Sequence, residues 1–202
     1  MVHVKSYSDI PFTDHSKRET LRYSGAMEST PELDSLISLC RNDLCERIRY
    51  SLCYSEFPVS ANGDELDLGF ARVSSRDLSK NLQGCKRIIL LAATVGMDVD
   101  RLISRYGRTS PSRALVYQAM GSERVESLCD TFCRELSLSL EHSGESARPR
   151  FSPGYGDLPL SLQRDIFSAL DCHKHIGLTL GDNLLMSPSK SVTAIIGILE
   201  KQ

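Results

Sequence analysis

Residues 85–96 read CKRIILLAATVG, and the part from 88 to 95 is apolar apart from one threonine. A nearly continuous apolar run of this length is expected for a strand that is covered on both faces, as in the centre of a sheet. Gly96 then ends the run where a turn is expected. We therefore predict that this stretch is the central strand of the fold and that the other elements pack around it.

The elements around this strand do not alternate regularly between helix and strand. Helical spacing of apolar residues predicts a helix from Thr30 and further helices over 74–84, 97–106, 112–140 and 160–171, with a bend at Gly121. Strands are predicted over 47–59, 65–73, 176–180 and 191–199, and the turn residues ANGD at 61–64 suggest that the first two form a hairpin. This mixed order is typical of an α+β fold rather than a doubly wound α/β sheet.

The chain has 202 residues, enough to bury a core without metal ions or disulfides. We separate an N-terminal segment of uncertain affiliation, residues 1–60, from a core over 61–202. The alternative is one continuous domain over 1–202.

Composition excludes several kinds of partner. The formal net charge is -2, so no basic surface is expected for nucleic acid, and no apolar stretch is long enough to cross a membrane. The seven cysteines are an odd number in mostly apolar surroundings, and no signal peptide is recognisable at the start of the chain. We therefore expect a cytoplasmic protein with structural, unpaired cysteines.

Three patterns that suggest chemistry are better explained as structure. The segment AATVGMDVD at 92–100 has the place of a phosphate-binding turn but lacks the glycines and lysine of one, so we expect a simple turn. The segment DCHKHIG at 171–177 is close to a DxHxxG cobalamin-ligand motif, but its glycine comes one residue late. We interpret His173 and His175 as the end of a helix, not as metal ligands, and predict no metal site. Serines are frequent, but no GxSxG nucleophile elbow is present.

The segment ARPRFSPGYGDLPLSLQRD, residues 147–165, is the best candidate for a ligand site. Arg150 can form two parallel hydrogen bonds to a carboxylate. Pro153 and Gly154 reverse the chain, and the glycine allows close approach of the backbone to a ligand. Tyr155 offers a hydroxyl group and an aromatic face that can contact a cation. These groups suit a ligand with a carboxylate, an amine and a further positive centre, although a solvated arginine beside a core tyrosine is the plain alternative.

The same residues resemble the activation (reactivation) domain of cobalamin-dependent methionine synthase. That family carries an Arg-x-x-x-Gly-Tyr motif, present here as RFSPGY at 150–155. A Leu-Thr segment, a methionine and a Pro-x-x-Ser-Val run follow in the family, and LTLGDNLLMSPSKSV at 178–192 has the same order. The resemblance covers about residues 85–198 and is strongest where both blocks occur at their usual separation.

The resemblance implies a C-shaped α+β domain around a bent, mainly antiparallel sheet with flanking helices. It implies an accessory module that binds S-adenosylmethionine and presents it to a cobalamin-bearing partner. The cobalamin belongs to a separate methionine synthase that lacks its own activation domain. An electron donor such as flavodoxin then supports reductive remethylation of inactive cob(II)alamin.

The resemblance also implies a set of S-adenosylmethionine contacts. Arg150 would hold the carboxylate of the ligand, Tyr155 would lie near the sulfonium or the amino acid part, and the backbone from Phe151 through Pro153 to Gly154 would contact adenosine. Glu145 lies near the place of an acidic contact to the ligand amine, and Ser191 belongs to the second block. No catalytic acid or base is implied, because the role is positioning.

Departures from the family leave two other functions open. The chain is too short for the homocysteine, folate and cobalamin domains, and it has Ile195 and Ile196 where larger members have an aromatic residue that contacts the ligand. The first alternative is a non-catalytic module that binds a corrinoid protein without using S-adenosylmethionine. The second is an unrelated methyltransferase for a small molecule.

Overall fold

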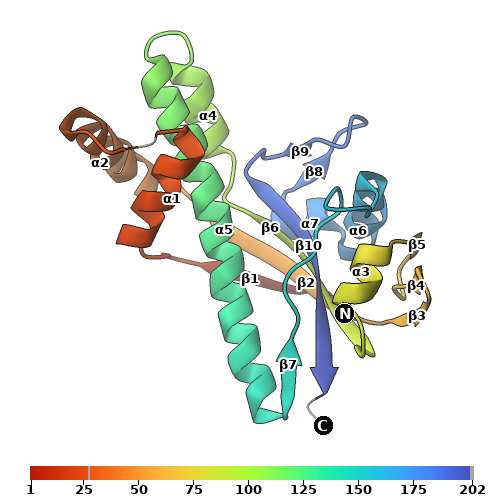
Figure 1. Ribbon diagram of the computed structural model, residues 1–202. Helices are drawn as coiled ribbons and strands as arrows, with labels where there is room; N and C mark the ends of the chain where they lie inside the picture. The colour runs from red at the N-terminus through yellow and green to blue at the C-terminus, as the bar shows by residue number, and fades with distance from the viewer. Residues whose placement is uncertain (27, 201–202) are drawn as a thin grey trace.

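The computed structural model describes residues 1–26 and 28–200 (Figure 1). Its main feature is a five-stranded sheet in the order β1-β2-β6-β10-β7, in which every neighbouring pair is antiparallel. The predicted α+β class with a bent antiparallel sheet is confirmed. The strands are β1 (His3–Tyr7), β2 (Tyr50–Pro58), β6 (Arg87–Thr94), β7 (Glu145–Ala147) and β10 (Ser191–Glu200).

The predicted central strand is β6, which pairs with β2 on one side and β10 on the other. Alternate side chains of a strand point to opposite faces. Accordingly Ile89, Leu91 and Ala93 lie in one hydrophobic core, whereas Ile88, Leu90 and Ala92 lie in a second core. The continuous apolar run is therefore explained by burial of β6 on both faces.

Each face of the sheet has its own cover (Figure 1). The first core is closed by α1 (Asp14–Ser24), α2 (Pro31–Cys45), α4 (Asp98–Tyr106) and α5 (Pro111–His142). The second core is closed by α3 (Arg76–Asn81), η1 (Leu160–Leu162), α6 (Gln163–Leu170) and α7 (Cys172–Ile176). Two small sheets complete the second side, made of β3 (Ser60–Asn62), β4 (Glu65–Asp67) and β5 (Arg72–Ser74), and of β8 (Thr179–Leu180) and β9 (Met186–Ser187).

Helix starts follow the capping residues in the sequence. The Thr30 hydroxyl accepts a hydrogen bond from the N–H of Leu33 at the start of α2, where Pro31 occupies the first turn. Ser75 caps α3 in the same way by accepting from the N–H of Leu78. Such caps satisfy N–H groups that have no partner within the helix.

The predicted hairpin of 47–59 with 65–73 is wrong. β2 pairs with β1 and β6, while residues 65–73 are split into β4 and β5 by a turn at Gly69. Gly69 has φ +75°, and a Cβ there would lie 2.9 Å from atoms of Pro58. The sequence gives no sign of this close approach.

Helix α5 is one helix through Gly121, the position of the predicted bend. A Cβ at this position would lie 2.6 Å from Cγ1 of Val99 and 2.9 Å from Cγ of Lys190. The glycine therefore allows α4 and the start of β10 to pack closely against α5. Among the described residues no helix is long and apolar enough to cross a membrane.

Candidate functional site

The edge strand β7 ends at Ala147, and the chain continues beside β10 through a bulge to Phe151. Ala147 pairs with Ile198 and Phe151 bridges to Ile195, so that residues 148–150 lie opposite residues 196–197. The extra residue on the outer strand is the signature of a β-bulge, which redirects side chains. Pro149, which has no N–H to give to a ladder, lies within it. As a result Ala147 and Arg150, three positions apart, both face α5.

Arg150 reaches two carboxylates on α5. Its Nη2 donates to Oε2 of Glu126 at 3.0 Å and to Oδ1 of Asp130 at 2.7 Å. The arginine side chain is 21% exposed, whereas those of Glu126 and Asp130 are 42% and 59% exposed. Among the described residues, no hydrogen-bond partner is found for Nε or Nη1 of Arg150. The ion pairs therefore orient the guanidinium and leave part of it free to bind an anion.

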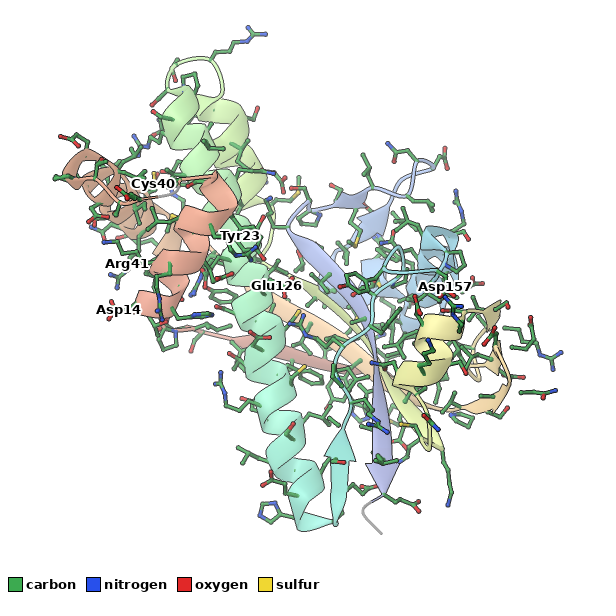
Figure 2. The ribbon with its side chains drawn as sticks, viewed as in Figure 1. Asp14, Tyr23, Cys40, Arg41, Glu126 and Asp157 are labelled. Atoms are coloured by element: carbon green, nitrogen blue, oxygen red, sulfur yellow. The ribbon has the colours of Figure 1, made fainter. Side chains whose placement is uncertain are left out.

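A cavity of about 660 Å³ lies between α5 and this strand. One wall comes from α5, the opposite wall from the bulged strand, and Val192 of β10 contributes between them. Figure 2 labels Glu126 on α5. The cavity is lined by Glu126, Cys133, Ser137, Ala147, Arg148, Pro149, Arg150, Ser152 and Val192.

The cysteines near this cavity are neutral thiols. Burial raises the pKa of Cys129 to about 12 and also raises the pKa of Cys133. All seven cysteines of the chain are unpaired, and four of them are buried. The interpretation of Cys129 and Cys133 as structural side chains agrees with this environment, although Cys133 also contributes to the cavity wall.

The turn after Arg150 is tightly bonded. Gly154, with φ +86°, donates from its N–H to the carbonyl of Leu158, and the N–H of Tyr155 donates to the carbonyl of Ser152. The Tyr155 ring packs edge-on against Phe151 with 5.8 Å between ring centroids. Tyr155 is 73% exposed and does not line the cavity.

The other predicted contacts lie apart from the cavity lining. Phe151 packs against the second core on the opposite face of the sheet. Glu145 of β7 accepts hydrogen bonds from Arg87 and Ser143, which lower the pKa of its carboxyl group. Ser191 is buried; its hydroxyl donates to the carbonyl of Pro188 and is also hydrogen-bonded to the hydroxyl of Thr94. Pro153 is buried at the turn.

Sequence reasoning did not identify Glu126 and Asp130. Their spacing of four residues places them on one face of α5, but this pattern is common on exposed helices. Both also line a smaller cavity of about 220 Å³ between α1 and α5, to which Tyr23 of α1 contributes (Figure 2). Glu126 therefore lines both cavities, whereas Asp130 lines only the smaller one.

His173 and His175 of DCHKHIG both lie within the short helix α7. Asp171 has φ +44° and ends α6. Over residues 1–26 and 28–200, no group of three or more His, Cys, Asp or Glu side chains is arranged to hold a metal ion.

Comparison with known proteins identifies a structural neighbour. No protein-family model and no curated protein sequence matches the chain. Among solved structures, the crystal structure of the MetH reactivation domain bound to AdoHcy matches with a TM-score of 0.67 and 15% sequence identity. The match covers 98% of this chain and 78% of that one. Over nearly its whole length, this chain thus has the fold of the MetH reactivation domain.

Proposed function

We propose that the protein binds S-adenosylmethionine in the cavity beside Arg150 and supports reductive remethylation of cob(II)alamin on a separate cobalamin-dependent methionine synthase. The observation that carries the proposal is the partly free Arg150 guanidinium, turned into a cavity on the fold of the MetH reactivation domain. The neighbouring structure contains AdoHcy, the product that remains when S-adenosylmethionine gives up its methyl group.

The charges at the cavity suit this ligand. The free N–H groups of Arg150 can bind a carboxylate, and Glu126 in the cavity wall offers a negative charge to a cationic group of the ligand, beside the second arginine of the wall, Arg148. S-adenosylmethionine carries a carboxylate, an ammonium group and a sulfonium, so its net charge is positive. The cavity volume of about 660 Å³ also lies within the usual range for small-molecule sites, about 300–1,000 Å³.

The protein would act by positioning. The cobalamin stays on the partner protein, and a flavodoxin-like donor supplies the electron that the remethylation requires. Methyl donor and acceptor must come within bonding distance, so binding and orientation of the donor are the contributions expected of this chain. Because the two proteins are separate, their encounter depends on concentration, unlike that of tethered domains.

Ile195 and Ile196 supply no ligand contact in this arrangement. Ile195 is buried in the second core and Ile196 in the first, and neither lines the cavity. Binding therefore depends on Arg150 and the α5 carboxylates without an aromatic contribution from β10.

Isothermal calorimetry tests the ligand. For the wild-type protein, we expect titration with S-adenosylmethionine to give a measurable heat of binding that reaches saturation. Arg150→Ala should lose at least about tenfold in affinity because a charge-assisted hydrogen bond is removed. Arg150→Lys should recover only part of it, since lysine cannot form the paired hydrogen bonds. Arg72→Ala, at an exposed ion pair with Asp67, is the control and should bind normally. Equal affinity of Arg150→Ala and wild type would remove Arg150 from the site.

A reconstitution experiment tests the role. The protein is mixed with a cobalamin-dependent methionine synthase truncated before its activation domain, S-adenosylmethionine and a reductant. Recovery of the methylcobalamin absorption spectrum is expected, and no recovery is expected when the protein is omitted. A spectrum that does not change in the complete mixture would contradict the proposed role.

A second candidate is a non-catalytic module that binds a corrinoid protein without S-adenosylmethionine. It is favoured by the pairing of Arg150 with Glu126 and Asp130 and by the position of Tyr155 outside the cavity. This candidate predicts complex formation with the truncated synthase but no calorimetric heat with S-adenosylmethionine.

A further inference from the structure

The segment that carries Arg150 is attached at both ends to one short piece of chain on the other side of the sheet edge. This piece, residues 75–83, consists of Ser75, helix α3 and the turn after it. We call it the α3 clamp. We propose that the α3 clamp, acting chiefly through Asp157, holds residues 148–157 in the conformation that binds ligand. The inference rests on the proposed function and assigns positioning residues to it.

The upper attachment is the carboxylate of Asp157, which lies at the first turn of α3 (Figure 2). Oδ1 of Asp157 accepts hydrogen bonds from the Ser75 hydroxyl at 2.5 Å and from the N–H of Asp77 at 3.2 Å. Oδ2 accepts from the N–H of Arg76 at 2.9 Å. One side chain thus connects the turn to N–H groups that the helix itself cannot satisfy.

The close approach at this end requires glycine. Gly156 has φ +54°, and a Cβ at this position would lie 2.5 Å from Oδ2 of Asp77. Any other residue at 156 would be strained at this φ and would push the Asp77 side chain aside. The sequence Gly-Tyr-Gly-Asp at 154–157 therefore contains both the tight turn and the group that attaches it.

The lower attachment is made at the bulge. Nδ2 of Asn81 donates to the carbonyl of Pro149 at 3.2 Å, and Nη2 of Arg148 donates to the carbonyl of Gln83 at 2.9 Å. Both bonds are made directly before Arg150 in the chain, and the bonds of Asp157 come after the turn that follows Arg150. Arg150 is therefore fixed between two attachments on the far side of the strand and two carboxylates of α5 on the near side.

Of the three attaching side chains, Arg148 belongs to the cavity wall and the other two do not. Asp157 and Asn81 do not line the cavity, so their effect on a ligand must pass through the segment between them. A displacement of about 1 Å in a binding group can remove a large part of its contribution to ligand binding. The α3 clamp therefore makes the affinity of the cavity depend on bonds outside it.

Hydrogen–deuterium exchange of the full chain without ligand tests the clamp. In Asp157→Ala we expect peptides covering 148–158 to exchange about tenfold faster, a change in line with the loss of a helix cap. Peptides of β6 should be unchanged. Asp157→Asn keeps an oxygen at Oδ1 and should be intermediate. Asp67→Ala is the matched control, because Asp67 also accepts from a turn N–H, that of Gly69, but has no contact with residues 148–158. Exchange of 148–158 equal to wild type in Asp157→Ala would overturn the proposal.

Calorimetry with S-adenosylmethionine then tests the consequence for binding. The affinity of Asp157→Ala should fall about tenfold, with partial recovery in Asp157→Asn and no change in Asp67→Ala. Faster exchange with unchanged affinity would overturn the positioning role. Absence of heat with the wild-type protein would instead refute the proposed function, while the exchange comparison would still decide whether the clamp holds the segment.

Discussion

Gly121 shows how one residue can reverse an expected effect on stability. At an ordinary exposed position in a helix, replacing glycine by alanine is favourable by about 1 kcal/mol. At Gly121 the added methyl group would lie 2.6 Å from Cγ1 of Val99 and 2.9 Å from Cγ of Lys190. Valine is stiff at this atom, so α4 would have to move away from α5.

We therefore expect Gly121→Ala to lower the free energy of unfolding by about 1–3 kcal/mol, the usual range for overpacking. Urea denaturation measures this quantity. Ser139→Ala, at an exposed position of the same helix, should change it by less than about 0.5 kcal/mol. A stabilised Gly121→Ala protein would show that α4 and α5 are less closely packed than described.

The sequence separation between individual residues explains which of the candidate site residues could be recognised in the sequence. Arg150, Gly154 and Tyr155 lie within six positions of each other, so their pattern is visible in the chain, but of these three only Arg150 lines the cavity. Glu126 and Asp130 are 24 and 20 positions before Arg150, and only folding brings them to it. Their contribution depends on the direction of Arg150, which the bulge at Pro149 determines.

At the scale of elements, Asp43 attaches α2 to α5. Its Oδ2 accepts a hydrogen bond from the Tyr117 hydroxyl at 2.6 Å, and Arg113 and Arg47 lie beside the carboxylate. Tyr117, followed by Arg47, lowers the pKa of the Asp43 carboxyl group in the folded protein. A lowered folded pKa gives stability that is present above the unfolded pKa of about 4 and is lost as pH falls through the folded value.

The substitution Asp43→Asn should therefore lower the free energy of unfolding most at neutral pH. We expect a loss of about 1–2 kcal/mol in the free energy of unfolding at pH 7, and a smaller loss at pH 3, which lies below the unfolded pKa, so that proton uptake by the unfolded wild-type chain already lowers its stability. Urea titrations at the two pH values provide the comparison, with the exposed Asp182→Asn as control. A loss that is the same at both pH values would exclude the charge of Asp43 as the cause.

The ends of helices and strands were predictable where the spacing of apolar residues agreed with the residues that begin or end an element. Elsewhere they were not predictable. The apolar run of β6 and the helical spacing of α5 gave nearly the correct limits. β1 is an edge strand with largely exposed side chains and has no apolar alternation to indicate it. The break between β4 and β5 depends on contact of Gly69 with Pro58, which is absent from local sequence signals.

For the whole molecule, the cavity joins distant parts of the fold. α5 covers the first face of the sheet, the bulged strand forms the edge, and Val192 belongs to β10. A ligand that binds only when these parts are assembled stabilises the folded state as a whole.

Saturating S-adenosylmethionine should accordingly raise the midpoint of thermal unfolding. At a concentration of about 100 times Kd the gain is about 2.7 kcal/mol, or about 5–10 °C for a chain of this size. Scanning calorimetry or fluorimetry with and without the ligand measures the shift. Arg150→Ala should show little of it at the same concentration, and a full shift in that variant would point to binding elsewhere.

The order of the strands has a consequence for biosynthesis. β10 follows every other element in the sequence, yet it lies between β6 and β7 and provides the partner of the bulged strand. A nascent chain that has emerged from the ribosome as far as α7 already contains Arg150, but it lacks the strand that sets the direction of this side chain. No metabolite can therefore assist the early stages of folding through this cavity, and until translation reaches β10 the half-made sheet must rely on its own contacts or on chaperones.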